Sequence, residues 1–374
     1  MFVERRLELA LTPSPLSQAG EEAAGRMLQC SGYTRPMNLL FRDVAGPGLA
    51  PGGSVLCVGA FDGVHLGHRA LLDHVSARAR TQGLVAGAIS FEPIPREFFA
   101  RGAPVPRLAS VREKIERIRE AGMSRLLLLR FDARLAAMEA EEFVERVLVG
   151  RCGAREIWIG ADFRFGHKRR GDVTMLEQLG QRHGFTAHTM ADIAIGGERV
   201  SSSAIRAHLA AGEFEEAARL LGRNFSIGGH VVHGQRLGRK LGYPTANVRL
   251  GRRTSPVGGI FAVRVRGVEA MPVPGVASLG VRPTVHGTEP LLEAHLFDFD
   301  GDLYGRRIDI EFVAKLRDEE KFPDLDAMVR QIDRDAGEAR AILGLPPQHR
   351  HPGEGRDPVP GRPRQGAGFR PSPE

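Results

Sequence analysis

The chain has 374 residues, enough for two domains, and its 42% hydrophobic and 26% charged residues are ordinary for a globular protein. A formal net charge of +7 suits phosphorylated ligands, but one Trp and three Tyr leave no basic-aromatic stripe of the kind that binds nucleic acid. Three cysteines without metal-binding spacing argue against a disulfide framework or a zinc site and favour a reducing cytoplasm. The absence of a long apolar run excludes a membrane-spanning segment.

The two ends of the chain differ in composition from the rest. Residues 1–36 have neither a strand pattern nor a sustained helix pattern, and residues 346–374 are rich in proline. Neither segment carries enough apolar residues to order itself, so we expect both to be disordered and dispensable. We interpret 1–36 as a misassigned start and Met37 as the more sensible one.

The first half of the folded chain alternates between strand and helix patterns. Apolar strand patterns occur at 55–58, 84–91, 125–131, 155–160 and 185–189. The helix after the second of these begins with a capping box, Ser110 to Glu113. This alternation over residues 37–222 predicts a doubly wound parallel sheet with ligand sites at the carboxyl ends of its strands.

The pattern changes near Asn224. Short β-type runs separated by Gly, Pro and Asp turns predict a small antiparallel β-barrel over residues 223–345. An amphipathic helix over about 325–343 is expected to close this second domain.

The most informative stretch is the first strand with the turn and helix that follow it. Two histidines, His65 and His68, lie three residues apart at the start of the helix, so both can face one ligand. A helix N-terminus favours anions, and the turn's glycines let a phosphate approach the backbone. One histidine alone would be read as a cap or a surface residue. The pair at this turn favours a phosphate site, although the chain has no Walker loop.

Two later stretches add to this site. Residues 160–166, GADFRFG, follow a strand end, where Asp162 alone could be a turn former. Residues 200–206, VSSSAIR, offer three hydroxyls, a helix N-terminus and Arg206 as a counter-charge for phosphate. Serine-rich caps are common, so this second stretch would carry little weight alone.

Taken in order, these stretches resemble the G-x-F-D-G-x-H-x-G-H, G-x-D-F-R-F-G and I-S-S-T-x-I-R signatures of the flavin-adenylylating branch of the nucleotidylyltransferases. The resemblance implies that His65 and His68 are catalytic and stabilise charge on a triphosphate. It assigns the flavin to Asp162, Phe163, Arg164 and Phe165. It further implies that the ATP phosphates are bound by Gly59, Phe61, Asp62, Gly67, Ser201, Ser202, Ser203 and Arg206.

One position departs from the family pattern. The family usually reads Phe-Asp/Glu-Pro-His-Pro after the second strand, whereas this chain has Ile94 in place of the histidine. Isoleucine cannot donate a hydrogen bond or carry charge. This departure therefore leaves open the alternative that the adenylyltransferase activity of the first domain is weakened.

The second domain carries a phosphate-binding motif of a different kind. Residues 229–248 form a glycine-rich run that could cradle phosphates with Gly234, Gly238, Arg239 and Lys240. Thr245 and Asn247 would share one side of a strand and offer oxygens to a metal ion. A barrel turn with capping residues is the alternative. The whole run resembles the riboflavin kinase signature G-x-x-x-G-R-x-L-G-F/Y-P-T-A-N.

A carboxylate stands further along this domain, within LLEAHLFDF. Alternation places Glu293 on the strand face of Leu291, His295 and Phe297, where a carboxylate is unusual unless it is functional or paired. The resemblance implies that Glu293 is the catalytic carboxylate of the kinase.

Because both modules occur in order over about 37–345, the chain is identified as a member of the prokaryotic bifunctional riboflavin kinase/FAD synthetase (FMN adenylyltransferase) family. The resemblance implies that 223–345 phosphorylate riboflavin to FMN with ATP. Residues 37–222 would adenylylate FMN with a second ATP, giving FAD and pyrophosphate. Mg²⁺ is the implied cofactor of both steps, and ATP the co-substrate. We expect no nucleic-acid or membrane partner, and leave weak homo-oligomerisation open.

Two alternative hypotheses for the function remain. In the first, the kinase alone is fully active and the first domain is weakened by Ile94. In the second, the basic surface binds nucleic acid, and that binding would fall steeply with added salt.

Overall fold

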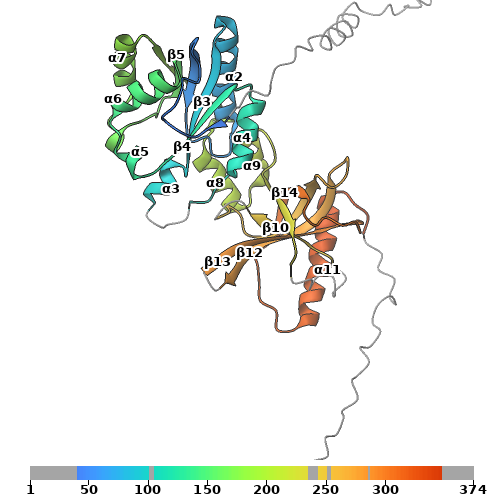
Figure 1. Cartoon of the computed structure of the whole chain (residues 1–374). Helices are drawn as coiled ribbons and strands as arrows, with labels where there is room; N and C mark the ends of the chain where they lie inside the picture. The colour runs from blue at the N-terminus through green and yellow to red at the C-terminus, as the bar shows by residue number, and fades with distance from the viewer. Residues whose placement is uncertain (1–39, 101–104, 235–242, 251–253, 285–286, 348–374) are drawn as a thin grey trace, which may run out of the picture.

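The structure is a computed structural model that describes residues 40–100, 105–234, 243–250, 254–284 and 287–347 (Figure 1). The predicted disordered segment 1–36 lies outside these residues, as does 346–374 apart from its first two positions. Gly238, Arg239 and Lys240 of the predicted phosphate loop also lie outside them.

The first domain is built on a parallel sheet. In the described residues this sheet has six strands in the order β1-β4-β3-β2-β5-β6, and each neighbouring pair is parallel. The strands are β1 (Leu40–Phe41), β2 (Ser54–Val58), β3 (Val85–Glu92), β4 (Arg125–Arg130), β5 (Ala154–Gly160) and β6 (Thr186–Met190). All five β2 residues are buried, because helices cover both faces of the sheet.

Alternate residues of the strands belong to two different apolar cores. Val55 and Leu72 belong to the core on the α2 and α4 face, while Leu56 and Leu148 belong to the core on the opposite face. The helices are α2 (Leu66–Gln82), α3 (Pro95–Phe99), α4 (Val111–Glu120), α5 (Ala133–Ala137), α6 (Ala140–Glu142) and α7 (Val173–His183). The prediction of a doubly wound sheet is confirmed, including the capping box at Ser110 and Glu113.

One expected helix is different. The sequence predicts an ordinary helix from about Glu139 to Val149, but the structure has α6 followed by a π-helix, η2 (Phe143–Arg151). The amide of Cys152 donates to the carbonyl of Val147, a wider spacing than in an α-helix. Periodicity did not reveal this, because Val144, Val147 and Leu148 are buried as they would be in an α-helix.

The strand order places a switch point in the middle of the sheet. The chain runs from β2 outward to β3 and β4, and then returns to the other side of β2 with β5 and β6. Ligands of such sheets bind in the crevice at the carboxyl ends of the two strands where the order reverses. Here those ends are Gly59, after β2, and Gly160, the last residue of β5.

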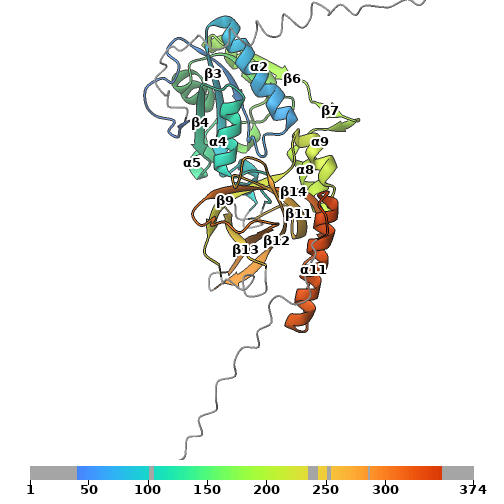
Figure 2. The same ribbon diagram turned by 90° about the vertical axis from the view of Figure 1, so that its right-hand side faces the viewer.

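The second domain is a closed antiparallel barrel. Its described strands follow the order β10-β13-β12-β11-β14-β9. They are β9 (Ser226–Val232), β10 (Ala246–Leu250), β11 (Gly259–Arg266), β12 (Val273–Thr284), β13 (Gly287–Leu296) and β14 (Arg307–Arg317). The helix α11 (Leu325–Ile342) lies along the outside of the barrel, as predicted (Figure 2).

Two helices join the domains. The short hairpin β7 (Ala194–Ile195) and β8 (Glu198–Arg199) leads into α8 (Ser202–Ala211) and α9 (Phe214–Leu221), which lie between sheet and barrel (Figures 1 and 2). Phe214 of α9 packs against Phe261 and Phe312 of the barrel, with ring centroids 5.7 and 6.4 Å apart. Side chains of α8, α9 and the barrel thus form one continuous core.

The first prediction concerns the C-terminal boundary. Beyond α11, Leu345 packs in the apolar cluster under the helix, and the carbonyl of Pro346 accepts a 2.8 Å hydrogen bond from Nε of Arg340. A chain of 37–347 should keep its melting temperature. A chain ending at 343 should lose about 1–2 kcal/mol of unfolding free energy, since an apolar contact and a hydrogen bond to a charged group disappear. Urea unfolding of both chains measures this, and equal stabilities would contradict it.

Candidate active sites

The turn between β2 and α2 has an unusual backbone. Phe61 and Val64 adopt positive φ angles of 49° and 42°, and Gly63 lies between them at 81°. Positive φ is disfavoured for non-glycine residues, most of all for a β-branched valine, and persists where the surroundings impose it. The Phe61 ring is fully buried and meets the His68 ring edge to face at 5.1 Å. The turn is therefore held by packing as well as by its sequence.

Two of the predicted phosphate ligands are partners of each other. The buried carboxylate of Asp62 accepts hydrogen bonds from the amides of Leu108 and Ala109, at 3.2 Å each, and forms an ion pair with Arg206. Arg206 also donates to the carbonyls of Pro106 and Ser202. The structure thus brings Asp62 and Arg206 together as a buried pair at the edge of the site.

The three serines occupy different positions. Ser201 is the N-cap of α8, and its hydroxyl accepts the amide of Ala204 at 3.1 Å. Ser202 donates to the carbonyl of Asp62 at 3.1 Å, while the Ser203 hydroxyl lies 3.3 Å from a guanidinium nitrogen of Arg96. The N-terminus of α8 is thereby fixed against the β2–α2 turn.

The two histidines stack on each other, with ring centroids 3.7 Å apart. His65 is the N-cap of α2, and its Nδ1 accepts the amide of His68 at 3.3 Å. Nδ1 of His68 is buried and has no hydrogen-bond partner among the described residues. A buried polar atom without a partner marks a place where a ligand can supply one.

Both imidazoles are neutral in this arrangement. Burial lowers the pKa of His65 to about 4. The negative charge of Asp62 opposes this shift, and the positive charges of Arg223 and Arg206 add to it. Burial, His65 and Lys114 hold the pKa of His68 well below its usual value. Because Nδ1 of His65 accepts a backbone amide, the neutral ring carries its proton on Nε2 and can donate it to a ligand oxygen.

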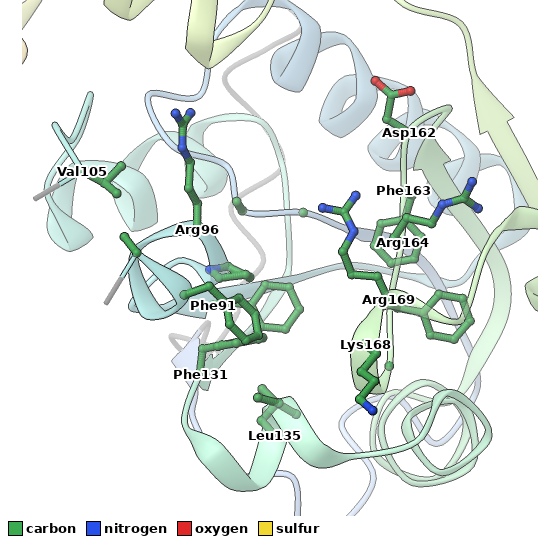
Figure 3. Close-up of a pocket in the computed structure, with 18 of the residues that line it drawn as sticks. Phe91, Arg96, Val105, Phe131, Leu135, Asp162, Phe163, Arg164, Lys168 and Arg169 are labelled. Atoms are coloured by element: carbon green, nitrogen blue, oxygen red, sulfur yellow. The ribbon is translucent and has the colours of Figure 1, made fainter. Parts of the chain in front are cut away.

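A cavity of about 1040 Å³ opens beside the turn, at the switch point of the sheet (Figure 3). Its size suits a ligand larger than one drug-sized molecule. Among the predicted site residues it brings together Gly59, Asp162, Phe163, Arg164, Phe165 and Arg206.

The cavity has an aromatic wall that the sequence only partly indicates. Phe163 and Phe165 stack at 5.5 Å, as expected for the predicted flavin motif. Opposite them, Phe131 meets Phe91 and the half-exposed Phe99 edge to face, each at 5.7 Å. The adjacent Phe98 and Phe99 in the short helix α3 were the sequence signal for this wall, which was not predicted.

Several cations also line the cavity, and not all of them have acidic partners. Arg164 pairs with Asp172 at 3.2 Å. Arg96, Lys168 and Arg169 have no carboxylate within ion-pair distance in the part of the chain that the structure describes. Lys168 and Arg169 both have positive φ, and Figure 3 shows the Arg169 side chain reaching into the cavity. Arg169 was not predicted as a site residue from the sequence.

The departure at position 94 lies behind the cavity. Ile94 is 3% exposed and is not among the described residues that line the cavity. The buried Lys114 donates to two carbonyls at this edge of the sheet. One belongs to Phe91, near the end of β3, and the other to Ala60, just after β2. Burial lowers the pKa of Lys114, and its ion pair with Glu92 opposes that shift. Lys114 thus ties together the two strand ends beneath the cavity.

The second candidate site lies on the outside of the barrel. Asn247 of β10 is directly opposite Glu293 of β13, and Glu293 is opposite Ser278 of β12. Neighbouring residues Leu292 and Ala294 face the barrel core, so these three polar residues share the outer face. The predicted side of Glu293 is confirmed, because Phe297 lies on the same outer face under α11.

A glycine allows a close approach at this second site. Gly234, just after β9, lies so near Asn247 that a β-carbon there would overlap its amide group. Asn247 is buried and Thr245 half-buried. The described residues contain no cluster of three or more His, Cys, Asp or Glu side chains that could hold a metal ion.

The fold and the two candidate sites define a class of protein: a two-domain chain with a histidine-capped turn on a parallel sheet and a row of polar residues on the outside of a barrel. Comparison with known proteins gives the family. The FAD synthetase family matches residues 49–204 and the riboflavin kinase family residues 221–343. The bifunctional riboflavin kinase/FMN adenylyltransferase of Escherichia coli K12 is 44% identical, over 78% of this chain and 94% of the relative. That of Pseudomonas fluorescens is 45% identical, over 80% and 95%.

The chain therefore belongs to the bifunctional riboflavin kinase/FMN adenylyltransferase family. It is an enzyme with an FAD synthetase domain followed by a riboflavin kinase domain. A crystal structure described as a macrolide-efflux protein from Streptococcus pneumoniae shares the fold, with TM-score 0.67 and 28% identity over 79% of this chain and 97% of that one. None of the helices in the described ranges has the length and apolar character needed to cross a membrane.

The buried His65 predicts a pH dependence of stability. Its pKa is about 4 when folded and about 6.5 when unfolded, so between these values the unfolded chain binds the extra proton. Stability should fall as the pH drops below 6.5. From pH 7.5 to pH 5, His65 should account for a loss of about 2 kcal/mol. In His65→Gln this part of the loss should vanish in urea unfolding, and an unchanged pH slope would contradict the assignment.

Proposed function

We propose that FMN adenylylation takes place in the cavity at the switch point of the sheet. The observation that carries this proposal is an aromatic-walled cavity with unpaired cations, whose lining includes Gly59 and Ala60 at the start of the turn that leads to the histidine pair. The aromatic faces suit an isoalloxazine ring, and the turn with the N-termini of α2 and α8 suits a triphosphate. The domains would span 37–222 and 223–345.

In this reaction an oxygen of the FMN phosphate attacks the α-phosphorus of ATP. The bond from that phosphorus to the bridging oxygen breaks, and pyrophosphate leaves with the electron pair. His65 donates from Nε2, and His68 supplies a second nitrogen whose protonation the bound phosphates favour. Ser201, Ser202 and Ser203 present the amides of α8, together with Gly59, Phe61 and Gly67 of the turn.

The Asp62–Arg206 pair fits a supporting role. Because the Asp62 carboxylate is buried and paired, it holds Arg206 and the turn in place rather than touching phosphate itself. Arg169 and Arg96 then remain to meet the phosphate of FMN. Asp162, Phe163, Arg164 and Phe165 line the flavin side of the cavity.

Riboflavin phosphorylation is assigned to the outer face of the barrel. The terminal hydroxyl of riboflavin attacks the γ-phosphorus of ATP, its proton passes to Glu293, and ADP leaves with the bond electrons. Gly234, Gly238, Arg239 and Lys240 would hold the ATP phosphates. Glu293 lies in register with Asn247, which supports a role for the two side chains in one site on neighbouring strands.

Mg²⁺ fits this second site by the chemistry of its donors. Thr245 and Asn247 offer neutral oxygens, which suit a hard cation that takes most of its ligands from phosphates and water. When bound, Mg²⁺ would neutralise charge on the transferring phosphate. The enzyme would act in the cytoplasm on riboflavin, FMN and ATP.

Neither rival reading is favoured. Both domains match their families, which supports two working activities rather than one. The direct test is to incubate the protein with riboflavin, ATP and Mg²⁺ and to separate the flavins by chromatography. FMN should form first and FAD after it. FMN without FAD would overturn the adenylylation proposal.

Substitution of His68 should separate the two activities. His68→Ala removes a group aimed at the triphosphate, so FAD formation from FMN should fall by ~10²–10³-fold. FMN formation from riboflavin should not change, because the kinase site is on the barrel. His74→Ala is the matched control, because His74 lies on the same helix but packs against Trp158 instead of against His65. Equal loss of both activities in His68→Ala would contradict the assignment.

Substitution of the barrel carboxylate tests the kinase step. Glu293→Gln keeps the size and hydrogen bonding of the side chain but cannot accept the proton, so kcat for FMN formation should fall by ~10²–10⁴-fold. Riboflavin binding, followed by fluorescence titration, should hardly change. Glu269→Gln, an exposed position between β11 and β12, serves as the control. Full turnover in Glu293→Gln with normal riboflavin binding would show that Glu293 is structural.

A further inference from the structure

Arg223 joins the two domains at the point where the chain enters the barrel. It lies between the end of α9 and the start of β9, inside the stretch that matches riboflavin kinase and outside the stretch that matches FAD synthetase. Yet its guanidinium group points back to the first domain. Nη1 donates to the carbonyl of Val64 at 3.2 Å, and Nη2 donates to the carbonyl of Gly63.

These two carbonyls belong to the part of the turn with positive φ. Gly63 and Val64 directly precede His65, so the orientation of their peptide groups sets where the imidazole of His65 lies. Val64 would relax toward ordinary φ values if nothing held it. Arg223 is a donor that reaches both carbonyls at once, because a guanidinium group presents its N–H donors in a rigid planar fork.

The surroundings keep Arg223 in place from the barrel side. Nη1 also donates to the carbonyl of Leu221 at 3.1 Å, at the end of α9. Gly222 packs so tightly on Leu66 of α2 that a β-carbon would lie 2.5 Å from its side chain. Across the junction, a carboxylate oxygen of Glu113 accepts the amide of Gly228 in β9 at 2.9 Å. The segment that carries Arg223 is thus fixed to both domains.

The charges around Arg223 support this role. Burial lowers its pKa to about 10, with Arg117 adding to the shift and Glu113, Asp309 and Glu120 opposing it. Arg223 therefore stays a cation at neutral pH. Burial and Glu113 in turn raise the pKa of Asp309.

We infer that Arg223 is a positioning residue for adenylyl transfer, through which the kinase half of the chain holds the Gly63–Val64 turn and the histidines that follow it. This inference rests on the proposed adenylylation at that turn. It goes beyond the proposed function because it makes the first active site depend on a residue of the second domain.

The test uses the full chain with Arg223→Ala. FAD formation from FMN should lose ~10–100-fold in kcat, the scale expected when a catalytic group moves by about 1 Å. The KM for FMN should stay close to wild type, because Arg223 does not line the described cavity. FMN formation from riboflavin should be unchanged. Guanidinium chloride, well below denaturing concentrations, should restore part of the FAD formation, which a general loss of structure would not allow.

Arg219→Ala is the matched control. Arg219 lies on α9 and donates to the carbonyl of Ile195 and to Glu216, away from the turn, so its loss should leave both activities unaltered. If Arg223→Ala does not fold, Arg223→Lys replaces it, since one ammonium group cannot reach both carbonyls as a guanidinium does. Unaltered FAD formation in the folded variant, or equal loss of both activities without rescue, would overturn the inference. Wild-type FAD formation tests the proposed function separately.

Discussion

The β2–α2 turn has a strained backbone, and the side chains that support it come from distant parts of the chain. Phe61, Gly63 and Val64 all have positive φ, and the histidines follow directly. Asp62 anchors one side of the turn through Arg206 of α8, and Arg223 anchors the other side through two carbonyls. Both arginines follow the parallel sheet in sequence, so the turn is held by α8 and by the residue after α9 as well as by the sheet domain.

The same arrangement explains the electrostatics of the site. Buried, stacked imidazoles stay neutral, and the Asp62–Arg206 pair balances its own charge. The positive charge at the cavity then comes from arginines that have no acidic partner among the described residues, Arg169 among them. In the barrel the polar row of Asn247, Glu293 and Ser278 stands apart, with neutral oxygens beside a single carboxylate. The two candidate sites thus differ in charge.

Much of this molecule could be predicted from local patterns. Apolar runs predicted five strands of the sheet, and the change of sequence pattern near Asn224 predicted the barrel. Alternation predicted which residues share a strand face with Glu293. The pairing of Asp62 with Arg206 could not be predicted, because 144 residues separate them and either could serve a phosphate. The same holds for Arg223, whose backbone contacts leave no trace in a side-chain pattern. The π-helix at Phe143–Arg151 kept a helical burial pattern, so periodicity could not distinguish it.

One chain is expected to perform two distinct transfers from ATP, and isotopic labelling tests this most directly. Riboflavin would be incubated with the protein, Mg²⁺ and ATP labelled either at the γ-phosphate or at the α-phosphate, and the flavins separated. The γ label should appear in both FMN and FAD, because the kinase step passes it to riboflavin. The α label should appear in FAD and never in FMN. An α label missing from FAD, or a γ label missing from FMN, would contradict the account.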